Sequence, residues 1–497
     1  MNFSGELCNV RKAIGIIGAS AFGCWPIAAT TGSSAHAGAA AELTWMCEPK
    51  PEEKGRCFSE TSSCSYNLGM AKQSIPSKTS TTFGTHGLNP KRTVGELKEL
   101  RILTGDADGA QRVAWTPTWA KARKWLDGKM QRLPVERVMD EAGNLWYTLK
   151  GKSKKELLIG GHMDSVPNGG WLDGSLNVLA GVEVMRRIAA QGVPPVTVRL
   201  VDWADEEGAR FGKSLFGSSA CSGSLNLNEA RNLQDQAGLR LPEVIAGYGI
   251  DFEQVKEAGR ELKNAAAYLE LHIEQGPVLL DLDLPLGAVL GTFGVERHAL
   301  TFHGQAAHSG STPMNRRRDA FLAAAKMSPE IYAIAERHGG VCTIGSCTTQ
   351  PGIVTSVVET CRMTLDQRHL DAFALAAMLA DAQAASERFA IEGNVTLTWE
   401  RIWQIEPMPF HPELIELCDE AISETTGVSH RLPSGPLHDA AEVARAGIPS
   451  IMMFVQSLHG ISHNKIEDTK EEHLEQAIVA FDKLADKAIQ WILKPAN

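Results

Sequence analysis

Short apolar runs that end in polar residues alternate with amphipathic segments along much of the chain. The clearest apolar runs are ELLIGGHMDSV and VTVRLVDWADEEG, which are typical of buried strands that deliver side chains at their C-terminal edge. Between them lies NVLAGVEVMRRIAAQG, whose helical periodicity and terminal glycine predict a helix. This alternation indicates an α/β layer with its functional site at the strand ends.

Two helices and a hairpin are expected before this layer. The pattern is helical over residues 89–126, with Leu97, Leu100 and Leu103 spaced for a buried stripe, and a second helix continues through WAKARKWLDGKM. Strand, turn and strand are then predicted over ERVMDEAGNLWYTL, with Gly143 in the turn.

The pattern changes near residue 291. An alternating strand is expected in GVERHALTFHGQ, a helix from Arg318, and another alternating stretch in VTSVVETCRMTLDQRHLD. This β-α-β-β character predicts an inserted α+β domain, after which the α/β pattern returns and ends in a helix. The expected organisation is an extension outside the fold (1–85), an α/β domain in two parts (86–290 and 401–497), and the insertion (291–400).

The first part of the chain permits two interpretations. Arg11 and Lys12 precede the apolar stretch AIGIIGASAFGCWPIAA and the small residues of SAHAGA, which is the layout of a secretory signal peptide. The alternative is that residues 1–69 are a poorly structured extension upstream of a start at Met70. A cytoplasmic location is expected, or a secretory or periplasmic one if residues 1–37 are a signal peptide.

Length and charge narrow the class of partner. A chain of 497 residues is too long for one ordinary core. The formal net charge of −10 argues against nucleic acid, and no later segment approaches the length of a membrane span. A small-molecule substrate is therefore expected, with neither a nucleic-acid nor a membrane partner.

Acidic and imidazole groups gather at the ends of the predicted strands. His162 and Asp164 form an HxD pair, in which the carboxylate can hold one ring nitrogen so that the other faces a metal ion. A lone histidine at a strand end is more often structural, but several such groups in order suit a site for two cations. The remaining members of this set are Asp173, Glu206, Glu207, His272 and His463.

Five ordered motifs carry a family resemblance: GGHMDSVPNGGWLDGSLNVLAGVEV, DEEGARFG, LELHIEQGPVL, HGQAAHSGSTPMNRRRDA and GISHN. They resemble the M20 metallopeptidase clan, and within it the hydantoinase/carbamoylase amidase branch. The similarity runs from about Asn89 to Ile492. It implies a phosphorylase/hydrolase-like catalytic domain with a mixed sheet, and an inserted ferredoxin-like α+β domain that serves as a lid and mediates homodimerisation.

The resemblance also implies a role for each residue of the set. His162 and His272 match ligands of one metal ion, Glu207 and His463 match ligands of the other, and Asp173 matches the carboxylate that bridges them. Glu206 matches the general base, and Asp164 the residue that orients His162. Two divalent cations per subunit are therefore expected, with zinc, manganese, cobalt or nickel as the candidates.

Substrate contacts are implied in the same way. His308 of AAHSG matches a histidine that stabilises the developing oxyanion, and in a dimer it acts either in its own subunit's site or in that of the neighbouring subunit. Arg368 matches the arginine that binds the substrate carboxylate, and Gln275 a polar pocket residue. The alternatives are a turn residue for His308 and an exposed strand residue paired with Asp366 for Arg368. Thr355 replaces the usual substrate-binding asparagine, which favours carbamoyl amino acids with sizeable side chains.

The expected activity is hydrolysis of the ureido C–N bond of N-carbamoyl-L-amino acids to amino acid, ammonia and carbon dioxide. Other enzymes of the clan remain as alternatives: allantoate or ureidoglycolate amidohydrolase, β-ureidopropionase, and an aminoacylase or dipeptidase. A non-catalytic metal- or ligand-binding protein is the alternative of a different class. Glu206 argues against it, because binding alone needs no general base.

Overall fold

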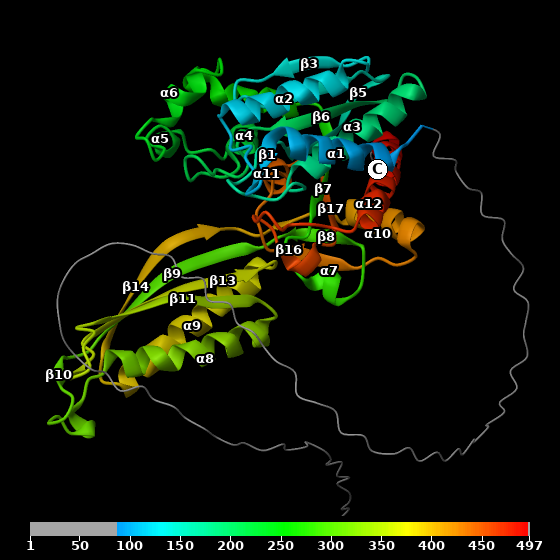
Figure 1. The fold of residues 1–497 in the computed structure, drawn as a ribbon. Coiled ribbons are helices and arrows are strands. Elements are labelled where there is room, and N and C mark those ends of the chain that lie inside the picture. Colours follow the sequence, from blue (N-terminus) through cyan, green and yellow to red (C-terminus); the bar gives the residue numbers. More distant parts are fainter. Residues whose placement is uncertain (1–86, 496–497) are drawn as a thin grey trace, which may run out of the picture. The chain divides into compact units, whose positions relative to one another are not determined.

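A computed structural model describes residues 87–495 of the chain (Figure 1). The expectations for the N-terminal extension, the signal peptide and a start at Met70 fall outside these residues. Buried apolar side chains form two separate cores, one around each of two large sheets.

A nine-stranded mixed sheet lies at the centre of the larger core, in the order β15-β8-β17-β7-β5-β6-β4-β3 with β16 beside β8. Neighbours β17, β7, β5 and β6 are parallel, so their C-terminal ends meet at one edge. The strands are β3 (Glu136–Met139), β4 (Leu145–Leu149), β5 (Ser153–His162), β6 (Val196–Trp203), β7 (Ala265–Ile273), β8 (Leu286–Thr292), β15 (Met408–Pro409), β16 (Arg431–Ser434) and β17 (Ser450–Val455).

Every residue of β6 is buried, which shows that both faces of this sheet are covered. Helices provide this cover. One group packs around α12 (Glu471–Leu493), which contacts α1 (Pro90–Thr104), α3 (Ser175–Ala190) and α10 (Pro412–Thr426), and α2 (Pro117–Met130) packs against α1. A second group consists of α4 (Phe216–Ser222), α11 (Asp439–Arg445) and the 3-10 helix η1 (Phe252–Leu262). Helices α1, α2 and α3, the hairpin β3-β4 and the strands β5 and β6 are present as predicted. The helical pattern predicted over residues 89–126 is wrong in its middle, because two short strands pair over residues 105–110 and α2 begins only at Pro117.

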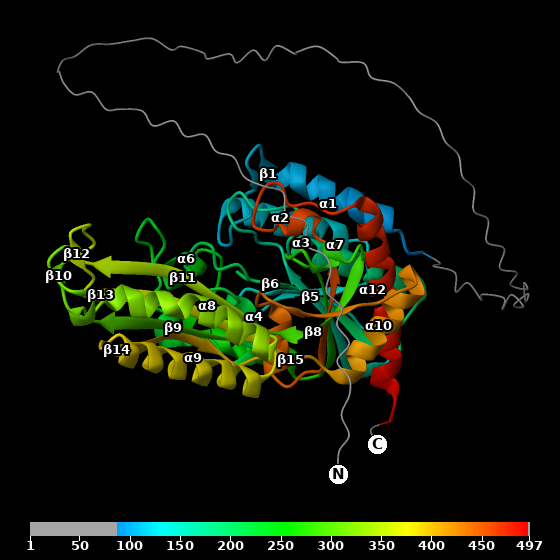
Figure 2. The same cartoon turned by 90° about the horizontal axis from the view of Figure 1, so that it is seen from below.

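The second core lies under a four-stranded antiparallel sheet in the order β11-β13-β9-β14. Helices α8 and α9 cover one face of it (Figures 1 and 2). The chain order β-α-β-β-α-β and this strand order are those of a ferredoxin-like fold, as predicted. The elements are β9 (Gly294–His303), α8 (Ala320–His338), β11 (Val341–Gln350), β13 (Thr360–His369), α9 (Ala372–Glu392) and β14 (Thr396–Ile405).

The helix α9 was not apparent in the sequence pattern, which indicated only β-α-β-β. Its sequence, AFALAAMLADAQAASERFAIE, is rich in alanine, so its buried and exposed faces differ little in polarity. The predicted domain ranges 86–290, 291–400 and 401–497 stay predictions.

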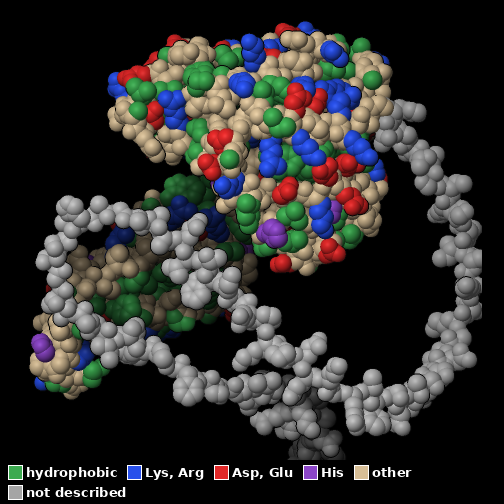
Figure 3. Space-filling model, in the orientation of Figure 1, with side chains coloured by type: hydrophobic (Ala, Val, Ile, Leu, Met, Phe, Trp, Pro, Cys, Tyr) green, Lys and Arg blue, Asp and Glu red, His purple; other side chains and the backbone are tan. Residues whose placement is uncertain are grey.

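Alternation along β13 gives the four-stranded sheet two different faces. Cys361, Met363 and Leu365 are buried against the helices, whereas Asp366 and Arg368 belong to the opposite set of positions. This second face therefore carries the charged side chains of β13. Acidic and basic side chains are also intermixed over the part of the nine-stranded domain that Figure 3 shows.

Short elements complete the described chain, and none of the helices within residues 87–495 is both long and apolar enough to cross a membrane. The short elements are β1 (Gly105–Asp106), β2 (Gly109–Ala110), α5 (Leu227–Ala230), α6 (Leu241–Ala246), α7 (Val278–Asp281), β10 (Ala307–His308) and β12 (Ser356–Val357), with the 3-10 turns η2 (Met314–Arg316) and η3 (Leu458–Gly460).

The smaller core depends on Leu365, which is fully buried between β13 and the two helices. We expect Leu365→Ala to lower the free energy of unfolding by about 2–5 kcal/mol, because it leaves a cavity among close-packed side chains. Denaturant titration followed by tryptophan fluorescence measures this change. The control Ile391→Ala alters a residue of α9 that is 80% exposed and is expected to cost less than about 0.5 kcal/mol. Equal effects of the two substitutions would contradict the assignment of this core.

Candidate active site

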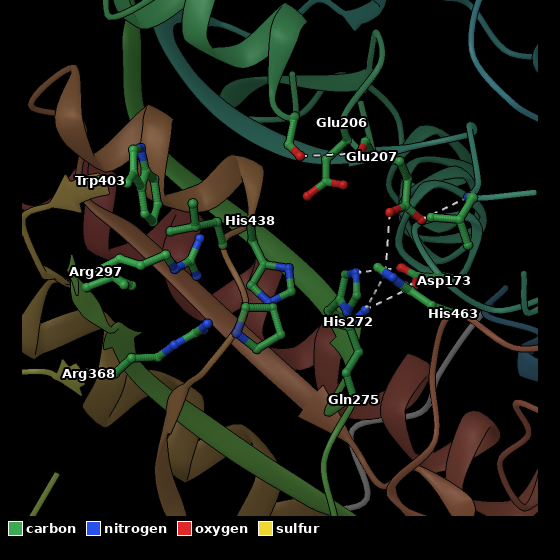
Figure 4. Close-up of a pocket in the computed structure, with 15 residues that line it drawn as sticks. Asp173, Glu206, Glu207, His272, Gln275, Arg297, Arg368, Trp403, His438 and His463 are labelled. Atoms are coloured by element: carbon green, nitrogen blue, oxygen red, sulfur yellow. Dashed lines mark hydrogen bonds and ion pairs between the residues drawn. The ribbon is translucent and has the colours of Figure 1, made fainter. Parts of the chain in front are cut away.

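Two groups of metal-ligating side chains share the carboxylate of Asp173. One comprises His162, Asp173 and His272, the other Asp173, Glu207 and His463, and the ligand atoms of each group lie within 4.8 Å of one another. The Nε2 atom of His272 is 3.1 Å from Oδ1 of Asp173, and Nε2 of His463 is 3.3 Å from Oε2 of Glu207 (Figure 4). The structure thus brings the five predicted ligands together, in the pairing that the family resemblance implies.

Parallel strands account for this convergence. His162 is the last residue of β5, His272 is the last but one of β7, and Glu206 and Glu207 follow the end of β6. Because these strands are neighbours and parallel, their final side chains meet at one edge of the sheet. Asp173 reaches this edge from the loop before α3.

Hydrogen bonds orient the imidazoles. Nδ1 of His272 lies 2.8 Å from the carbonyl oxygen of Ile273, to which it donates when Nε2 is the free nitrogen. Nδ1 of His162 lies 3.2 Å from the carbonyl oxygen of Asp164, and its Nε2 has no hydrogen-bond partner within residues 87–495. A buried ring nitrogen without a protein partner is what a histidine ligand requires.

Asp164 connects this histidine to the acidic turn after β6. Its Oδ1 atom is 3.6 Å from Nδ1 of His162. Its two carboxylate oxygens also accept hydrogen bonds from the backbone N–H groups of Glu206 and Glu207, at 3.3 and 3.1 Å. One buried carboxylate therefore fixes an imidazole and the backbone of two glutamates at the same time.

The electrostatics favour a cation. Burial raises the pKa of Glu207 well above its ordinary value, and the charge of Asp173 adds to this effect. Burial also raises the pKa of Glu206 well above its ordinary value, against the opposing charge of His162, and the charges of Asp439 and Glu207 add to the rise. A divalent cation would relieve this repulsion, and imidazole nitrogens with carboxylate oxygens suit zinc, manganese, cobalt or nickel. The three histidines and two carboxylates of the two ligand groups therefore fit a metal centre.

Backbone contacts hold Asp173 in place. Oε1 of the buried Glu467 accepts hydrogen bonds from the N–H groups of Leu172 and Asp173, both at 3.1 Å. Gly170 allows this contact, since a Cβ atom there would lie 1.9 Å from Cδ of Glu467. Glu467 was not predicted from the sequence, although it lies in GISHNKIEDT, because it acts through the backbone.

A cavity of about 390 Å³ lies against this centre. Asp173, Glu206, Glu207, His272 and His463 line it, and Arg297, Arg368 and Trp403 line it from the four-stranded sheet (Figure 4). Arg368 therefore lines the cavity, and its role in binding a carboxylate stays a prediction. Nε of Arg368 also donates to Oδ1 of Asp366 at 2.8 Å, so the predicted alternative pairing is present too. Arg297 and Trp403 were not predicted.

Gln275 and His438 also line the cavity. The side-chain amide of Gln275 donates to Oδ2 of Asp173 at 3.0 Å, so in this structure it supports the predicted bridging carboxylate. The ring of His438 lies 4.4 Å from that of His272, between centroids. Burial and the nearby charge of His272 lower the pKa of His438 well below its ordinary value, so His438 is neutral at pH 7.

His308 and Thr355 are not brought to this cavity. His308 belongs to β10, which pairs with β12, and the carbonyl oxygen of Thr355 accepts a hydrogen bond from Ser309. These segments adjoin the Thr360 end of β13, whereas Arg368 is near its other end. At ~3.3 Å per residue, the two ends of this strand are about 30 Å apart.

A model of one protein family, Peptidase family M20/M25/M40, matches residues 158–487. The chain belongs to this family. The resemblance inferred from the motifs is thereby confirmed.

Several M20 relatives are amidohydrolases. The chain is 36% identical over 371 residues to the N-carbamoyl-L-amino acid amidohydrolase of Geobacillus stearothermophilus, covering 73% of this chain and 90% of that one. It is 31% identical over 378 residues to the allantoate amidohydrolase of Escherichia coli K12, covering 75% and 91%. Among solved structures, a hydantoinase/carbamoylase family amidase from Burkholderia multivorans matches with a TM-score of 0.74 and 29% identity, covering 82% and 99%.

This M20 site depends on the glycine that follows Asp173. Gly174 has a φ of +64°, and a Cβ atom there would lie 2.4 Å from the ring of His162. We expect Gly174→Ala to displace this imidazole, to reduce the bound metal measured by mass spectrometry, and to destabilise the fold by about 1–3 kcal/mol.

Gly223 provides a matched control. It has a φ of +82°, and a Cβ atom added there would meet no heavy atom of residues 87–495 within 4 Å beyond its own chain neighbours. Gly223→Ala therefore introduces backbone strain without a clash. If both variants kept the same metal content, contact with His162 would not be the reason for a glycine at position 174.

Proposed function

We propose that this M20 amidohydrolase cleaves the ureido C–N bond of N-carbamoyl-L-amino acids. The observation that carries the proposal is a single cavity with the acidic and imidazole centre on one side and Arg368 on the other. This arrangement suits a small substrate with a reactive carbonyl group at one end and a carboxylate at the other. The 36% identity to an N-carbamoyl-L-amino acid amidohydrolase supports the same substrate class.

Arg368 would bind the substrate carboxylate. Asp366 and the carbonyl oxygen of Gly435 already accept hydrogen bonds from it, which orients its planar guanidinium group. One N–H on each terminal nitrogen remains for the substrate, and charge-assisted hydrogen bonds of this kind are stronger than neutral ones. The ureido group then extends toward Glu206.

His162, Asp173 and His272 would hold one divalent cation, and Asp173, Glu207 and His463 a second. When bound, such cations polarise a carbonyl oxygen and make water more acidic. The role of the protein is to hold the ligand atoms in place and to keep the unliganded carboxylate of Glu206 beside them.

Glu206 would transfer the proton. It is buried, and its Oε2 atom is 3.7 Å from Nε2 of His162, so it faces the same space as the ligand atoms. It takes a proton from the attacking water and delivers it to the amino nitrogen as the C–N bond breaks. The amino acid leaves, and the carbamic acid that remains decomposes to ammonia and carbon dioxide.

Allantoate hydrolysis is the second candidate, because the chain is also 31% identical to an allantoate amidohydrolase. Allantoate likewise combines a ureido group with a carboxylate. Thr355, at the position of the usual asparagine, is the sequence feature that favours carbamoyl amino acids. Ureidoglycolate amidohydrolase and β-ureidopropionase activities are tested by the same substrate panel.

A homodimer would complete the site. His308 lies far along the sheet from the cavity of its own chain, and the segments around it expose Met314, Ile353 and Val354, the last at 97%. Exposed apolar residues of this kind favour contact with another protein surface. The four-stranded domain would therefore mediate dimerisation and place His308 and Thr355 in the partner subunit's cavity.

Ammonia release tests the substrate. We expect metal-reconstituted enzyme to hydrolyse N-carbamoyl-L-methionine with a higher kcat/KM than allantoate, ureidoglycolate or N-carbamoyl-β-alanine. Glu206→Gln should lower kcat by about 10²–10⁴-fold, because it keeps the shape of the side chain but removes the base. Metal content is measured in parallel and should not change. Absence of ammonia from every N-carbamoyl-L-amino acid would refute the proposal.

Mixed dimers test the role of His308. Glu206→Gln and His308→Ala enzymes are each expected to be nearly inactive, whereas reassembly of an equal mixture should restore about a quarter of wild-type activity. In each heterodimer, the site with an intact Glu206 receives the intact His308 of its partner. The control His303→Ala changes the histidine that ends β9 of the four-stranded sheet and should stay active. A mixture without activity would show that His308 does not act across the dimer.

A further inference from the structure

A second guanidinium group lines the cavity beside Arg368. In the sheet register, Arg297 of β9 is paired with Asp366, and Arg368 is paired with Val295. Arg297 and Arg368 are therefore diagonal neighbours on the charged face of the sheet, with Cβ atoms about 7 Å apart. Both side chains line the cavity, together with Trp403 (Figure 4).

Arg297 has free hydrogen-bond donors. Its Nε and Nη2 atoms both donate to Oδ2 of Asp366, at 2.9 and 2.7 Å. Its Nη1 atom has no acceptor among residues 87–495. By contrast, Nη1 of Arg368 donates to the carbonyl oxygen of Gly435 at 3.0 Å. Since a guanidinium group carries five N–H donors and two of them bind Asp366, Arg297 keeps three, two on Nη1 and one on Nη2.

The surroundings of Arg297 strengthen an interaction with an anion. Trp403 is paired with it across β14, and the guanidinium carbon lies 5.3 Å from the centre of the indole ring. The side chain of Arg297 is 40% exposed, so a ligand can reach it from the cavity. A charged pair formed beside this ring is less screened by water than one on an open surface.

We propose that Arg297 binds a second carboxylate of the substrate, so that N-carbamoyl derivatives of acidic amino acids are the preferred substrates. The α-carboxylate occupies Arg368, and the side-chain carboxylate of an aspartyl or glutamyl substrate occupies Arg297. This inference rests on the proposed carbamoyl amino acid activity and specifies its substrate class.

A substrate with a neutral side chain suits the part of the cavity lined by Arg297 less well. A methionine or glutamine side chain of similar length would cover the guanidinium group of Arg297 without offering a carboxylate. Leaving a charged donor unpaired when water is displaced costs more than an ordinary lost hydrogen bond. A carboxylate at the same place accepts two N–H bonds and pairs the charge.

Two nearly isosteric substrates isolate this interaction. We expect kcat/KM for N-carbamoyl-L-glutamate to exceed that for N-carbamoyl-L-glutamine by at least about tenfold, which is the usual range for a hydrogen-bonded charge pair. Arg297→Gln should reduce this ratio to about one, mainly through KM of the glutamate derivative. Arg297→Lys keeps the charge and should retain part of the preference.

Arg362→Gln is the matched control. Arg362 is on the same face of β13, pairs with Glu400 at 3.4 Å, and does not line the cavity. Its substitution should leave the ratio unchanged. A wild-type ratio near or below one, or a ratio that Arg297→Gln does not alter, would overturn the second-carboxylate site. In that case turnover of N-carbamoyl-L-methionine would still support the proposed function, whereas failure of all carbamoyl substrates would overturn both.

Discussion

The carboxylate of Asp173 contacts three imidazoles, at 3.1 Å from His272, 3.4 Å from His463 and 3.7 Å from His162. Gathering so many ionisable groups in a buried place costs free energy, because each must leave water. The rest of the fold supplies the rigidity that keeps them together. The imidazoles of His162 and His272 belong to adjacent parallel strands, and Glu467 binds the backbone of Asp173 from a loop that is distant in sequence.

Prediction from the sequence was most reliable where an apolar strand pattern ends in residues that can bind a metal ion. Strand β5 contains the apolar run LLIGG just before its last residue, and β6 is rich in valine and leucine. The ends of the two strands carry residues that the structure brings together, from His162 to Glu207. Because neighbouring parallel strands share an edge, motif order was enough to predict a common site. Helix α9 was missed because an alanine-rich helix has little contrast between its faces.

Other parts of the site depend on pairing between distant segments. Arg297 and Asp366 are 69 residues apart in the chain, and only the register of β9 and β13 shows that they meet. Taken alone, an arginine on an alternating strand is typical of an exposed surface. His308 and Thr355 illustrate another limit of sequence reasoning. A motif predicts the role of a residue, but it does not show whether the residue acts in the site of its own subunit or of a partner. Their assigned roles remain predictions.

Asp366 has a consequence for how the enzyme responds to acidity. Burial opposes ionisation of this side chain, but hydrogen bonds from Arg368 and Arg297 lower its pKa below the ordinary value. Guanidinium groups stay protonated across the physiological range, so this wall keeps a constant charge. Among the cavity residues, the carboxylates with strongly raised pKa values are Glu206 and Glu207, at the opposite end. The arginines that we propose to bind the substrate carboxylates therefore keep their charge at any physiological pH, whatever the protonation of the two glutamates.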